Sequence, residues 1–336
     1  MRVALTDPVE PICEAILQQA GHEILRPEGT GPDAMRALCR EAEAIIVRQK
    51  LPDDLLDHAP RLLAAVRHGV GVDLIPVEAC TAHGVLVANV PGANADAVAE
   101  FLVAQMLAVA RHVEAMHAEH LARGWGAARA RSEAATELRG KTLGILGVGA
   151  IGSRLAEIAA LGFRMRVLGY RRNPAGLPPH VTYADLPDLF AESDYVALAC
   201  PLTPETRGIV SAPLLARMKP TAWLLNVARG PVVDEAALLD ALRARRIGGA
   251  ALDVYWQQPL AADHPLRSLD NVLLTPHTAG LTRESVVEMS RVAAEEVVRI
   301  LRGERPKNFI NPEAWAAAQD RRRALGYATA GEASPR

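Results

Sequence analysis

The sequence has few cysteines, little excess charge and no long apolar segment, and each shortage excludes a class of protein. The formal net charge is −2, so no broad basic field is available for nucleic acid or for an anionic membrane surface. The longest apolar helical segment, residues 97–110, contains Glu100 and Gln105 and is too short to span a bilayer. We therefore expect neither a nucleic-acid partner nor a membrane partner.

Four cysteines are scattered along the chain: Cys13, Cys39, Cys80 and Cys200. They show no Cys-x-x-Cys spacing, which predicts free thiols in a reducing compartment and neither disulfides nor a metal site. Met1 and Arg2 lead directly into a strand-like segment, without the pattern typical of a signal peptide. These features predict a cytoplasmic protein that holds no metal.

Short apolar segments, typical of strands, alternate with helical patterns along nearly the whole chain. The strands expected first are residues 2–6, 44–47, 62–66 and 86–89, with helices such as 11–20 and 33–43 between them. The strands expected later are residues 142–146, 165–170, 195–199, 222–227, 250–253 and 272–275. Such alternation predicts parallel sheets covered by helices on both faces. The 336 residues suffice for two of them, so we expect an α/β protein with two doubly wound parallel-sheet domains.

Two long helices are expected to connect these domains. One, at about residues 96–123, joins the two sheets, and the other, at about residues 283–302, returns the chain to the first domain. A cofactor domain of residues 97–284 would then be inserted into a substrate domain of residues 1–96 and 285–318. Residues 319–336 are rich in Arg and Ala with little apolar periodicity, so we expect a mobile tail there.

The expected strand at residues 142–146 runs into Gly147-Val148-Gly149-Ala150-Ile151-Gly152, a G-x-G-x-x-G sequence that a helical pattern follows. Gly147 would permit a tight turn, Gly149 would let the backbone approach a pyrophosphate, and Gly152 would let the helix pack on the strand. The N-terminus of that helix would face the phosphate charge. This combination predicts a dinucleotide-binding Rossmann domain.

The end of the next expected strand indicates which dinucleotide is bound. NAD enzymes usually have an acidic residue there, which binds the ribose 2′-OH. Here Arg171 and Arg172 follow the strand, and two guanidinium groups without a carboxylate suit a 2′-phosphate. The alternative is that both are solvated loop residues and that NAD binds through its pyrophosphate. On this pattern we favour NADP over NAD.

Two polar residues follow strands of the second domain. Arg229, in the segment Asn226-Val227-Ala228-Arg229-Gly230, could hold a carboxylate with two parallel hydrogen bonds. Its position fits an exposed strand-end arginine equally well. His277, in Thr275-Pro276-His277, is a candidate general acid or base because the unperturbed pKa of histidine lies near neutrality. A structural histidine is the alternative.

Taken together, five segments resemble the D-isomer-specific 2-hydroxyacid dehydrogenase family, and the resemblance extends from about residue 40 to 312. The segments are Leu146–Gly152, Pro201-Leu202-Thr203-Pro204-Glu205-Thr206, Asn226–Gly230, Leu252-Asp253-Val254-Tyr255 and Thr275–His277. The resemblance implies a Rossmann domain inserted into a flavodoxin-like substrate domain, and a homodimer formed through the cofactor domains. It also implies reduction of a small 2-oxo acid, such as glyoxylate or hydroxypyruvate, with NAD(P)H.

The resemblance also assigns roles to individual residues. Arg229 would bind the substrate carboxylate and polarise the carbonyl, and His277 would deliver the proton to the carbonyl oxygen. The backbone at Val70 and Gly71 would cradle the carboxylate, and Arg48 would contact the substrate. Besides the three loop glycines and the two strand-end arginines, the residues expected at the cofactor are Ala150, Ile151, Pro201, Thr206, Val227, Ala228, Asp253 and Gly280.

One departure from the family pattern concerns the neighbour of the catalytic histidine. The family has Glu five residues after the Asp that reaches the nicotinamide carboxamide, which here is Asp253, and Gln258 stands in that position. A carboxylate would raise the pKa of His277, whereas an amide orients the ring without charge. A Gln–His pair resembles formate dehydrogenase, so hydride transfer without a proton relay is one alternative. A low-turnover NAD(H)-binding sensor or partner protein is another.

Overall fold

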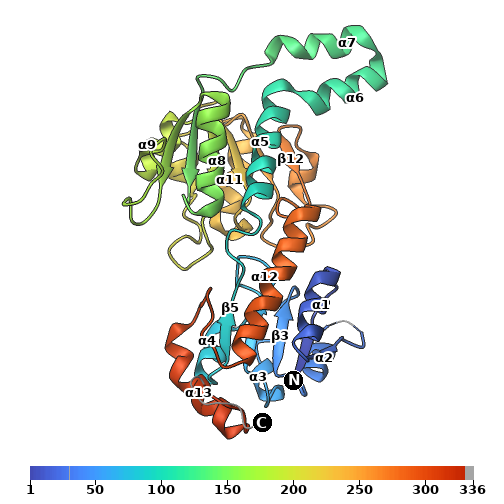
Figure 1. Ribbon diagram of the computed structural model, residues 1–336. Helices are drawn as coiled ribbons and strands as arrows, with labels where there is room; N and C mark the ends of the chain where they lie inside the picture. The colour runs from blue at the N-terminus through green and yellow to red at the C-terminus, as the bar shows by residue number, and fades with distance from the viewer. Residues whose placement is uncertain (30, 330–336) are drawn as a thin grey trace. The chain divides into compact units, whose positions relative to one another are not determined.

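The computed structural model describes residues 1–29 and 31–329, which form two compact units. Unit 1 comprises Met1–Asn94 and the chain from Thr282 onward, and unit 2 comprises Ala95–Leu281. Each unit has its own parallel sheet with helices on both faces (Figure 1). The predicted α/β class with two parallel-sheet domains is confirmed.

The sheet of unit 1 has the strand order β2-β1-β3-β4-β5, which is the flavodoxin-like order. Its strands are β1 (Arg2–Leu5), β2 (Glu23–Leu25), β3 (Ala44–Val47), β4 (Ala64–Arg67) and β5 (Leu86–Ala88). Successive residues of a strand point to opposite faces, so Val3 and Leu5 lie in one hydrophobic core and Ala4 lies in the other. Because both faces are covered, these strands are apolar almost throughout.

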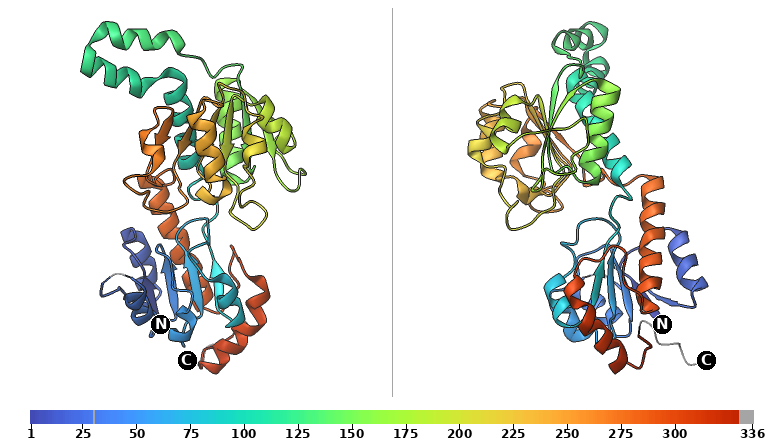
Figure 2. Two further views of the ribbon diagram at one scale, coloured as in Figure 1. Left: turned by 180° about the vertical axis from the view of Figure 1, so that it is seen from behind. Right: turned by 60° about the vertical axis from the view of Figure 1, so that its left-hand side comes forward.

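Helices cover the two faces of the unit 1 sheet. They are α1 (Pro11–Gln19), α2 (Pro32–Cys39), α3 (Leu55–His58), α4 (Val77–Ala82), α12 (Arg283–Leu301) and α13 (Trp315–Ala324). α1 and α12 lie side by side on one face (Figure 2). On the other face, α2 and α3 bury Met35, Leu38 and Leu55 against the sheet. The side chain of Thr282 caps the N-terminus of α12 by accepting a hydrogen bond from the Ser285 amide.

The sheet of unit 2 has the order β12-β11-β10-β9-β6-β7-β8, a Rossmann arrangement in which the chain enters at a central strand. Its strands are β6 (Thr142–Leu146), β7 (Arg166–Tyr170), β8 (Thr182–Tyr183), β9 (Tyr195–Leu198), β10 (Trp223–Asn226), β11 (Gly249–Leu252) and β12 (Val272–Leu274). α5 (Ala95–Arg111) and α8 (Ala150–Glu157) cover one face. α9 (Leu186–Glu192), α10 (Ala212–Leu215) and α11 (Glu235–Arg243) cover the other.

The helix expected at residues 96–123 is broken, and its second half belongs to a projecting arm. The break is at His112, which adopts a left-handed φ of 53°. α6 (Val113–Arg123), α7 (Trp125–Ala130) and the 3₁₀ helix η1 (Arg131–Ala134) form the arm, which extends away from the sheet of unit 2 (Figure 1). Glu119 accepts hydrogen bonds from Arg123 at 2.6 Å and from Arg131 at 2.7 Å, and so joins α6 to η1.

The expectation of a mobile tail at residues 319–336 is wrong for residues 319–329. α13 continues to Ala324, and Arg322 is only 4% exposed. Its guanidinium donates to the carbonyl oxygens of Ile300, Leu301 and Ala328. The neighbouring Arg321 donates to the carbonyl oxygens of Ala59, Pro60 and Leu62. These arginines anchor the segment to unit 1 instead of leaving it solvated. Residues 330–336 lie outside the described residues.

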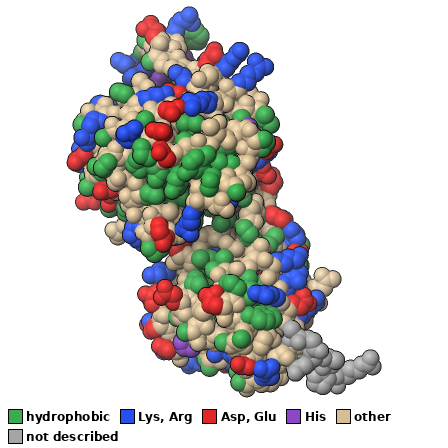
Figure 3. Space-filling view, turned by 90° about the vertical axis from the view of Figure 1, so that its left-hand side faces the viewer, with side chains coloured by type: hydrophobic (Ala, Val, Ile, Leu, Met, Phe, Trp, Pro, Cys, Tyr) green, Lys and Arg blue, Asp and Glu red, His purple; other side chains and the backbone are tan. Residues whose placement is uncertain are grey.

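Within residues 1–29 and 31–329, no helix combines the length and the hydropathy that crossing a bilayer requires. No group of three or more His, Cys, Asp or Glu side chains in this part of the chain is arranged to hold a metal ion. On the face seen in Figure 3, basic and acidic side chains are interspersed, so this face has no broad region of positive charge.

Candidate active site

The Gly147–Gly152 loop joins β6 to α8 at the carboxyl edge of the unit 2 sheet. Gly147 has a φ of +104°, and a Cβ there would lie 2.5 Å from the backbone nitrogen of Cys200. A Cβ on Gly152 would lie 2.3 Å from the carbonyl oxygen of Gly147. At Gly149, by contrast, a Cβ would meet no described atom within 4 Å, so the backbone is open there. The loop thus fits a pyrophosphate that approaches the N-terminus of α8.

Arg171 and Arg172 follow β7, and no carboxylate stands at the end of that strand. Arg172 is largely exposed, and its Nη2 lies 3.9 Å from Oε2 of Glu205. A hydrogen bond from the hydroxyl of Thr203 lowers the pKa of Glu205, and the charge of Arg172 adds to this effect. Two guanidinium groups therefore follow β7, and Arg172 lies near a carboxylate from a different loop.

Arg229 lies in the turn after β10, and a buried amide shapes this turn. The side chain of Asn226 is fully buried; it donates to the carbonyl oxygen of Arg229 at 3.1 Å and accepts from the amide of Ala228 at 3.0 Å. The guanidinium of Arg229 donates to the carbonyl oxygen of Ala228 at 2.8 Å. The next position requires glycine, because a Cβ on Gly230 would lie 2.1 Å from the carbonyl carbon of Tyr255. The sequence thus presents the guanidinium at the carboxyl edge of the sheet.

His277 lies in the turn after β12, and its backbone adopts a left-handed φ of 57°. Asp253, the residue after β11, holds this turn from within the protein and is only 1% exposed. It accepts hydrogen bonds from the Thr275 hydroxyl at 2.7 Å and from the amides of Thr278 and Ala279, both at 2.9 Å. The carboxylate therefore compensates a backbone conformation that is unfavourable for a non-glycine residue.

The imidazole of His277 is oriented by Gln258, whose Oε1 lies 2.9 Å from Nδ1. An amide oxygen can only accept, so neutral His277 carries its proton on Nδ1 and leaves Nε2 as a hydrogen-bond acceptor. Both side chains are exposed on unit 2. The pair places a ring nitrogen that can gain or lose a proton at the same edge of the sheet as Arg229.

In unit 1, the expected substrate residues also follow strands. Arg48 comes after β3, and its guanidinium donates to the carbonyl oxygen of Pro8. Val70 and Gly71 come after β4, in a turn that Arg67 holds through hydrogen bonds to the carbonyl oxygens of His68 and Gly71. Sequence reasoning missed Arg67; its only signal was a charged residue at the end of a buried apolar strand.

Sequence reasoning also missed a pair that supports the loop of Gln258. Nε2 of His264 lies 2.7 Å from Oε1 of Glu235, in the first turn of α11, and Nδ1 of His264 accepts from the Leu266 amide. The pair ties the loop after β11 to the helix that follows Arg229. Within unit 2 the structure therefore brings the glycine loop, Arg229, Gln258 and His277 to one edge of the sheet.

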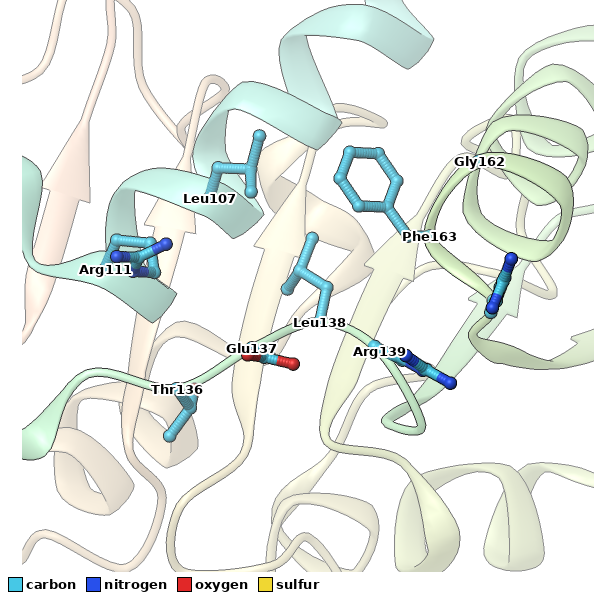
Figure 4. Close-up of a pocket in the computed structure, with 9 residues that line it drawn as sticks. Leu107, Arg111, Thr136, Glu137, Leu138, Arg139, Gly162 and Phe163 are labelled. Atoms are coloured by element: carbon cyan, nitrogen blue, oxygen red, sulfur yellow. The ribbon is translucent and has the colours of Figure 1, made fainter.

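A pocket of about 510 Å³ lies at the opposite edge of the unit 2 sheet, before β6 and β7. In Figure 4, Leu107, Leu138 and Phe163 form its apolar part, and Arg111, Glu137 and Arg139 lie around it. None of the residues expected at the substrate or the cofactor lines it. It is therefore separate from the candidate active site.

Comparison with known proteins agrees with this geometry. Residues 103–279 match the model of the D-isomer specific 2-hydroxyacid dehydrogenase NAD-binding domain. The chain is 42% identical over 293 residues to a glyoxylate reductase of Aeropyrum pernix, covering 84% of this chain and 86% of that protein.

Two solved structures have a TM-score of 0.81. One is an NADPH-dependent glyoxylate/hydroxypyruvate reductase from Sinorhizobium meliloti in complex with NADP and malonate, which is 28% identical and covers 93% of this chain and 97% of that one. The other is an NAD-dependent formate dehydrogenase from Staphylococcus aureus in complex with NAD, which is 29% identical and covers 92% and 99%. The chain therefore belongs to the D-isomer-specific 2-hydroxyacid dehydrogenase family of NAD(P)-dependent oxidoreductases.

Proposed function

We propose that the chain reduces a small 2-oxo acid, with glyoxylate or hydroxypyruvate as its substrate. The observation that carries this proposal is the placement of Arg229 and the Gln258-paired His277 at one edge of the Rossmann sheet, after β10 and β12, the two strands that flank β11. A guanidinium suits the carboxylate of such an acid, and an imidazole suits proton transfer at its carbonyl oxygen. The names of the relatives from Aeropyrum pernix and Sinorhizobium meliloti support the choice of substrate.

The carboxylate and the carbonyl oxygen of the substrate each have a proposed partner. Arg229 binds the carboxylate through two parallel N–H groups and offsets the negative charge that develops on the carbonyl oxygen. The amides of Val70 and Gly71 also bind the carboxylate, and Arg48 contacts the substrate. These residues orient the acid so that only one face of its carbonyl is attacked.

The proton is proposed to move at Nε2 of His277. In reduction, the protonated ring donates from Nε2 to the carbonyl oxygen, and in oxidation the neutral ring accepts the hydroxyl proton there. Gln258 holds Nδ1 and so leaves proton exchange to Nε2, but it supplies no charge to stabilise the imidazolium. Reduction should therefore weaken at a lower pH than in a protein with Glu at this position.

The cofactor is proposed to be NADP, held with its pyrophosphate over Gly147, Gly149 and Gly152. When bound, the nicotinamide supplies or accepts the hydride. Arg171 and Arg172 would bind the 2′-phosphate, because two guanidinium groups follow β7, and the ion pair of Arg172 with Glu205 is long, at 3.9 Å. The other residues proposed to line the cofactor are Ala150, Ile151, Pro201, Thr206, Val227, Ala228, Asp253 and Gly280. The buried carboxylate of Asp253 has, in addition, the role of holding the His277 turn.

The arm of unit 2 supports the proposal that the chain is a homodimer. Leu121 is 74% exposed and Trp125 is 71% exposed, and no residue of α6 is buried. Apolar side chains so exposed on a projecting helix pair favour burial against a second copy. Light scattering should give twice the chain mass, and the double variant L121E/W125E should give the monomer mass. We further propose a cytoplasmic location, which the buried free cysteines favour.

A panel of 2-oxo acids, assayed with NADPH and with NADH, tests the proposed function. We expect NADPH oxidation with glyoxylate or hydroxypyruvate, and a loss of about 100-fold or more in kcat/KM for Arg229→Gln. Arg217→Gln, which removes an exposed arginine elsewhere in unit 2, should leave kcat/KM unchanged. Tight cofactor binding without turnover of any acid would instead favour a sensor.

Formate oxidation is the second candidate, because the Gln258–His277 pair resembles the Gln–His pair of formate dehydrogenase. Formate loses a hydride to give CO₂, and no proton has to pass through His277. Formate with NAD or NADP as the only substrates provides the direct assay. Production of reduced cofactor from formate, with none consumed in the presence of 2-oxo acids, would replace the first proposal by the second.

A further inference from the structure

We propose that Arg67 is a positioning residue that anchors both ends of the turn whose two central amides are proposed to bind the substrate carboxylate. Arg67 is the last residue of β4, and its guanidinium lies behind the turn formed by Gly69, Val70 and Gly71. The inference rests on the proposed role of Val70 and Gly71, and it adds the residue that anchors the ends of their turn.

Arg67 connects three backbone segments with one rigid group. Its Nη1 donates to the carbonyl oxygen of Val47, on the neighbouring strand, at 2.7 Å and to that of His68 at 2.6 Å. Its Nε donates to the carbonyl oxygen of Gly71 at 3.1 Å. The planar guanidinium thus fixes the beginning and the end of the turn against β3, which the single ammonium of a lysine could not do.

The remaining carbonyl groups of the turn also face the protein. The oxygen of Gly69 accepts from the amide of Val90 at 3.0 Å, and the oxygen of Val70 accepts from the side chain of Asn89 at 2.7 Å. Four consecutive carbonyl groups are therefore bound from the inner side. Among the described residues, the amides of Val70 and Gly71 have no hydrogen-bond acceptor.

This arrangement explains the glycine at position 69. Its φ is +147°, and a Cβ there would lie 3.2 Å from the guanidinium carbon of Arg67. The backbone therefore passes directly over the guanidinium. Because a peptide group points its N–H away from its C=O, the inward carbonyls of Gly69 and Val70 leave the amides of Val70 and Gly71 directed outward, where an anion can accept from both. Arg67 holds the peptide groups on either side of these two.

The test compares two arginines of unit 1 that both donate hydrogen bonds to backbone carbonyl oxygens, one at the turn and one away from it. Arg67→Met removes the guanidinium behind the turn, and Arg321→Met removes one that donates to three carbonyl oxygens away from it. The readouts are KM and kcat for glyoxylate with NADPH, and the Kd of oxamate, a carboxylate without a reducible carbonyl, measured by calorimetry on the NADPH complex. Arg67→Met should raise KM and Kd about tenfold, with kcat nearly unchanged, because binding to the carboxylate is lost equally before and during reaction.

Arg321→Met should lower the stability of unit 1 and leave KM and Kd unchanged. In Arg67→Ala, the space left by the side chain can admit free guanidinium. Guanidinium chloride at millimolar concentration should therefore lower the KM of this variant and not affect the wild type. If Arg67→Met does not fold, Asn89→Leu, which frees the carbonyl of Val70, must raise KM and Kd in the same way. Unchanged values in the foldable variant, or equal changes in Arg321→Met, would overturn the proposal. If the wild type reduces no 2-oxo acid, the proposed function fails, whereas oxamate binding still decides the role of Arg67.

Discussion

Replacement of Gln258 by Glu should extend 2-oxo acid reduction to higher pH. In the structure, Oε1 of Gln258 lies 2.9 Å from Nδ1 of His277, so a carboxylate oxygen at the same place would face the ring at hydrogen-bond distance. The negative charge would stabilise the imidazolium and raise the pKa of His277 in the variant. Because reduction needs the protonated ring, the alkaline limb of kcat/KM should move to higher pH.

The size of this shift follows from the distance and the exposure. Two unit charges about 4 Å apart interact by about 1 kcal/mol in water and about 4 kcal/mol at an effective dielectric constant near 20. Both side chains are exposed on unit 2, so the lower part of this range applies. Since about 1.4 kcal/mol corresponds to one pH unit, the midpoint of the alkaline limb should rise by about one unit.

The assay is a pH profile of kcat/KM for the best 2-oxo acid, measured for the wild type, Gln258→Glu and Gln257→Glu. Gln257 is the exposed neighbour, and Glu at this position adds the same charge without a contact to His277. Only Gln258→Glu should shift the profile, and the shift should shrink as salt is added. Identical profiles for the wild type and Gln258→Glu, or equal shifts in both variants, would refute the electrostatic argument.

Three further changes have defined outcomes. The double variant Arg171→Ser/Arg172→Ser should raise the KM for NADPH about tenfold or more and leave that for NADH nearly unchanged; equal effects on both cofactors would contradict a 2′-phosphate site. Burial, with nearby guanidinium groups, lowers the pKa of His68 to about 4. His68 is therefore protonated below about pH 6.5 in the unfolded chain but only below about pH 4 in the folded chain. The free energy of unfolding, measured with urea, should fall by up to about 3 kcal/mol as the pH is lowered between these values. His68→Gln should weaken this pH dependence. Arg322→Met should lower the free energy of unfolding by about 2–4 kcal/mol, because it leaves buried carbonyl groups unpaired, and a loss below about 0.5 kcal/mol would show that residues 319–329 do not depend on it.

The fold was predictable where apolar strands are buried on both faces. β3 and β6 coincide with their expected ranges, since continuous apolar runs such as Ala44–Val47 are typical of parallel strands that are covered on both faces. The edge strand β2, which includes the exposed Glu23, and the two-residue β8 were not predicted. Both lie at sheet edges, where pairing with a neighbouring strand, more than composition, determines the structure.

The break at His112 could not be read from composition, because neither Pro nor Gly marks it. A helical pattern continues through it, and the left-handed φ of His112 is seen only in the structure. The same reasoning applies to residues 319–329. Their Arg- and Ala-rich composition with little apolar periodicity predicted a mobile tail, but arginine can also bind backbone carbonyl groups, and the sequence does not show which carbonyls are near.

The candidate site also contains residues that the sequence identifies and residues that only the structure identifies. Residues that a motif marks, such as Arg229 and His277, lie at strand ends as expected, because the carboxyl edge of a parallel sheet is where loop residues reach a ligand. The sequence does not mark a residue for the role of holding another residue in place. Asp253 belongs to a motif, yet its three hydrogen bonds hold the left-handed turn of His277, and Arg67 is recognised only by the carbonyl groups it binds. A sequence motif therefore identifies the groups proposed to meet the ligand, whereas the hydrogen bonds that hold the turns of those groups are seen only in the structure.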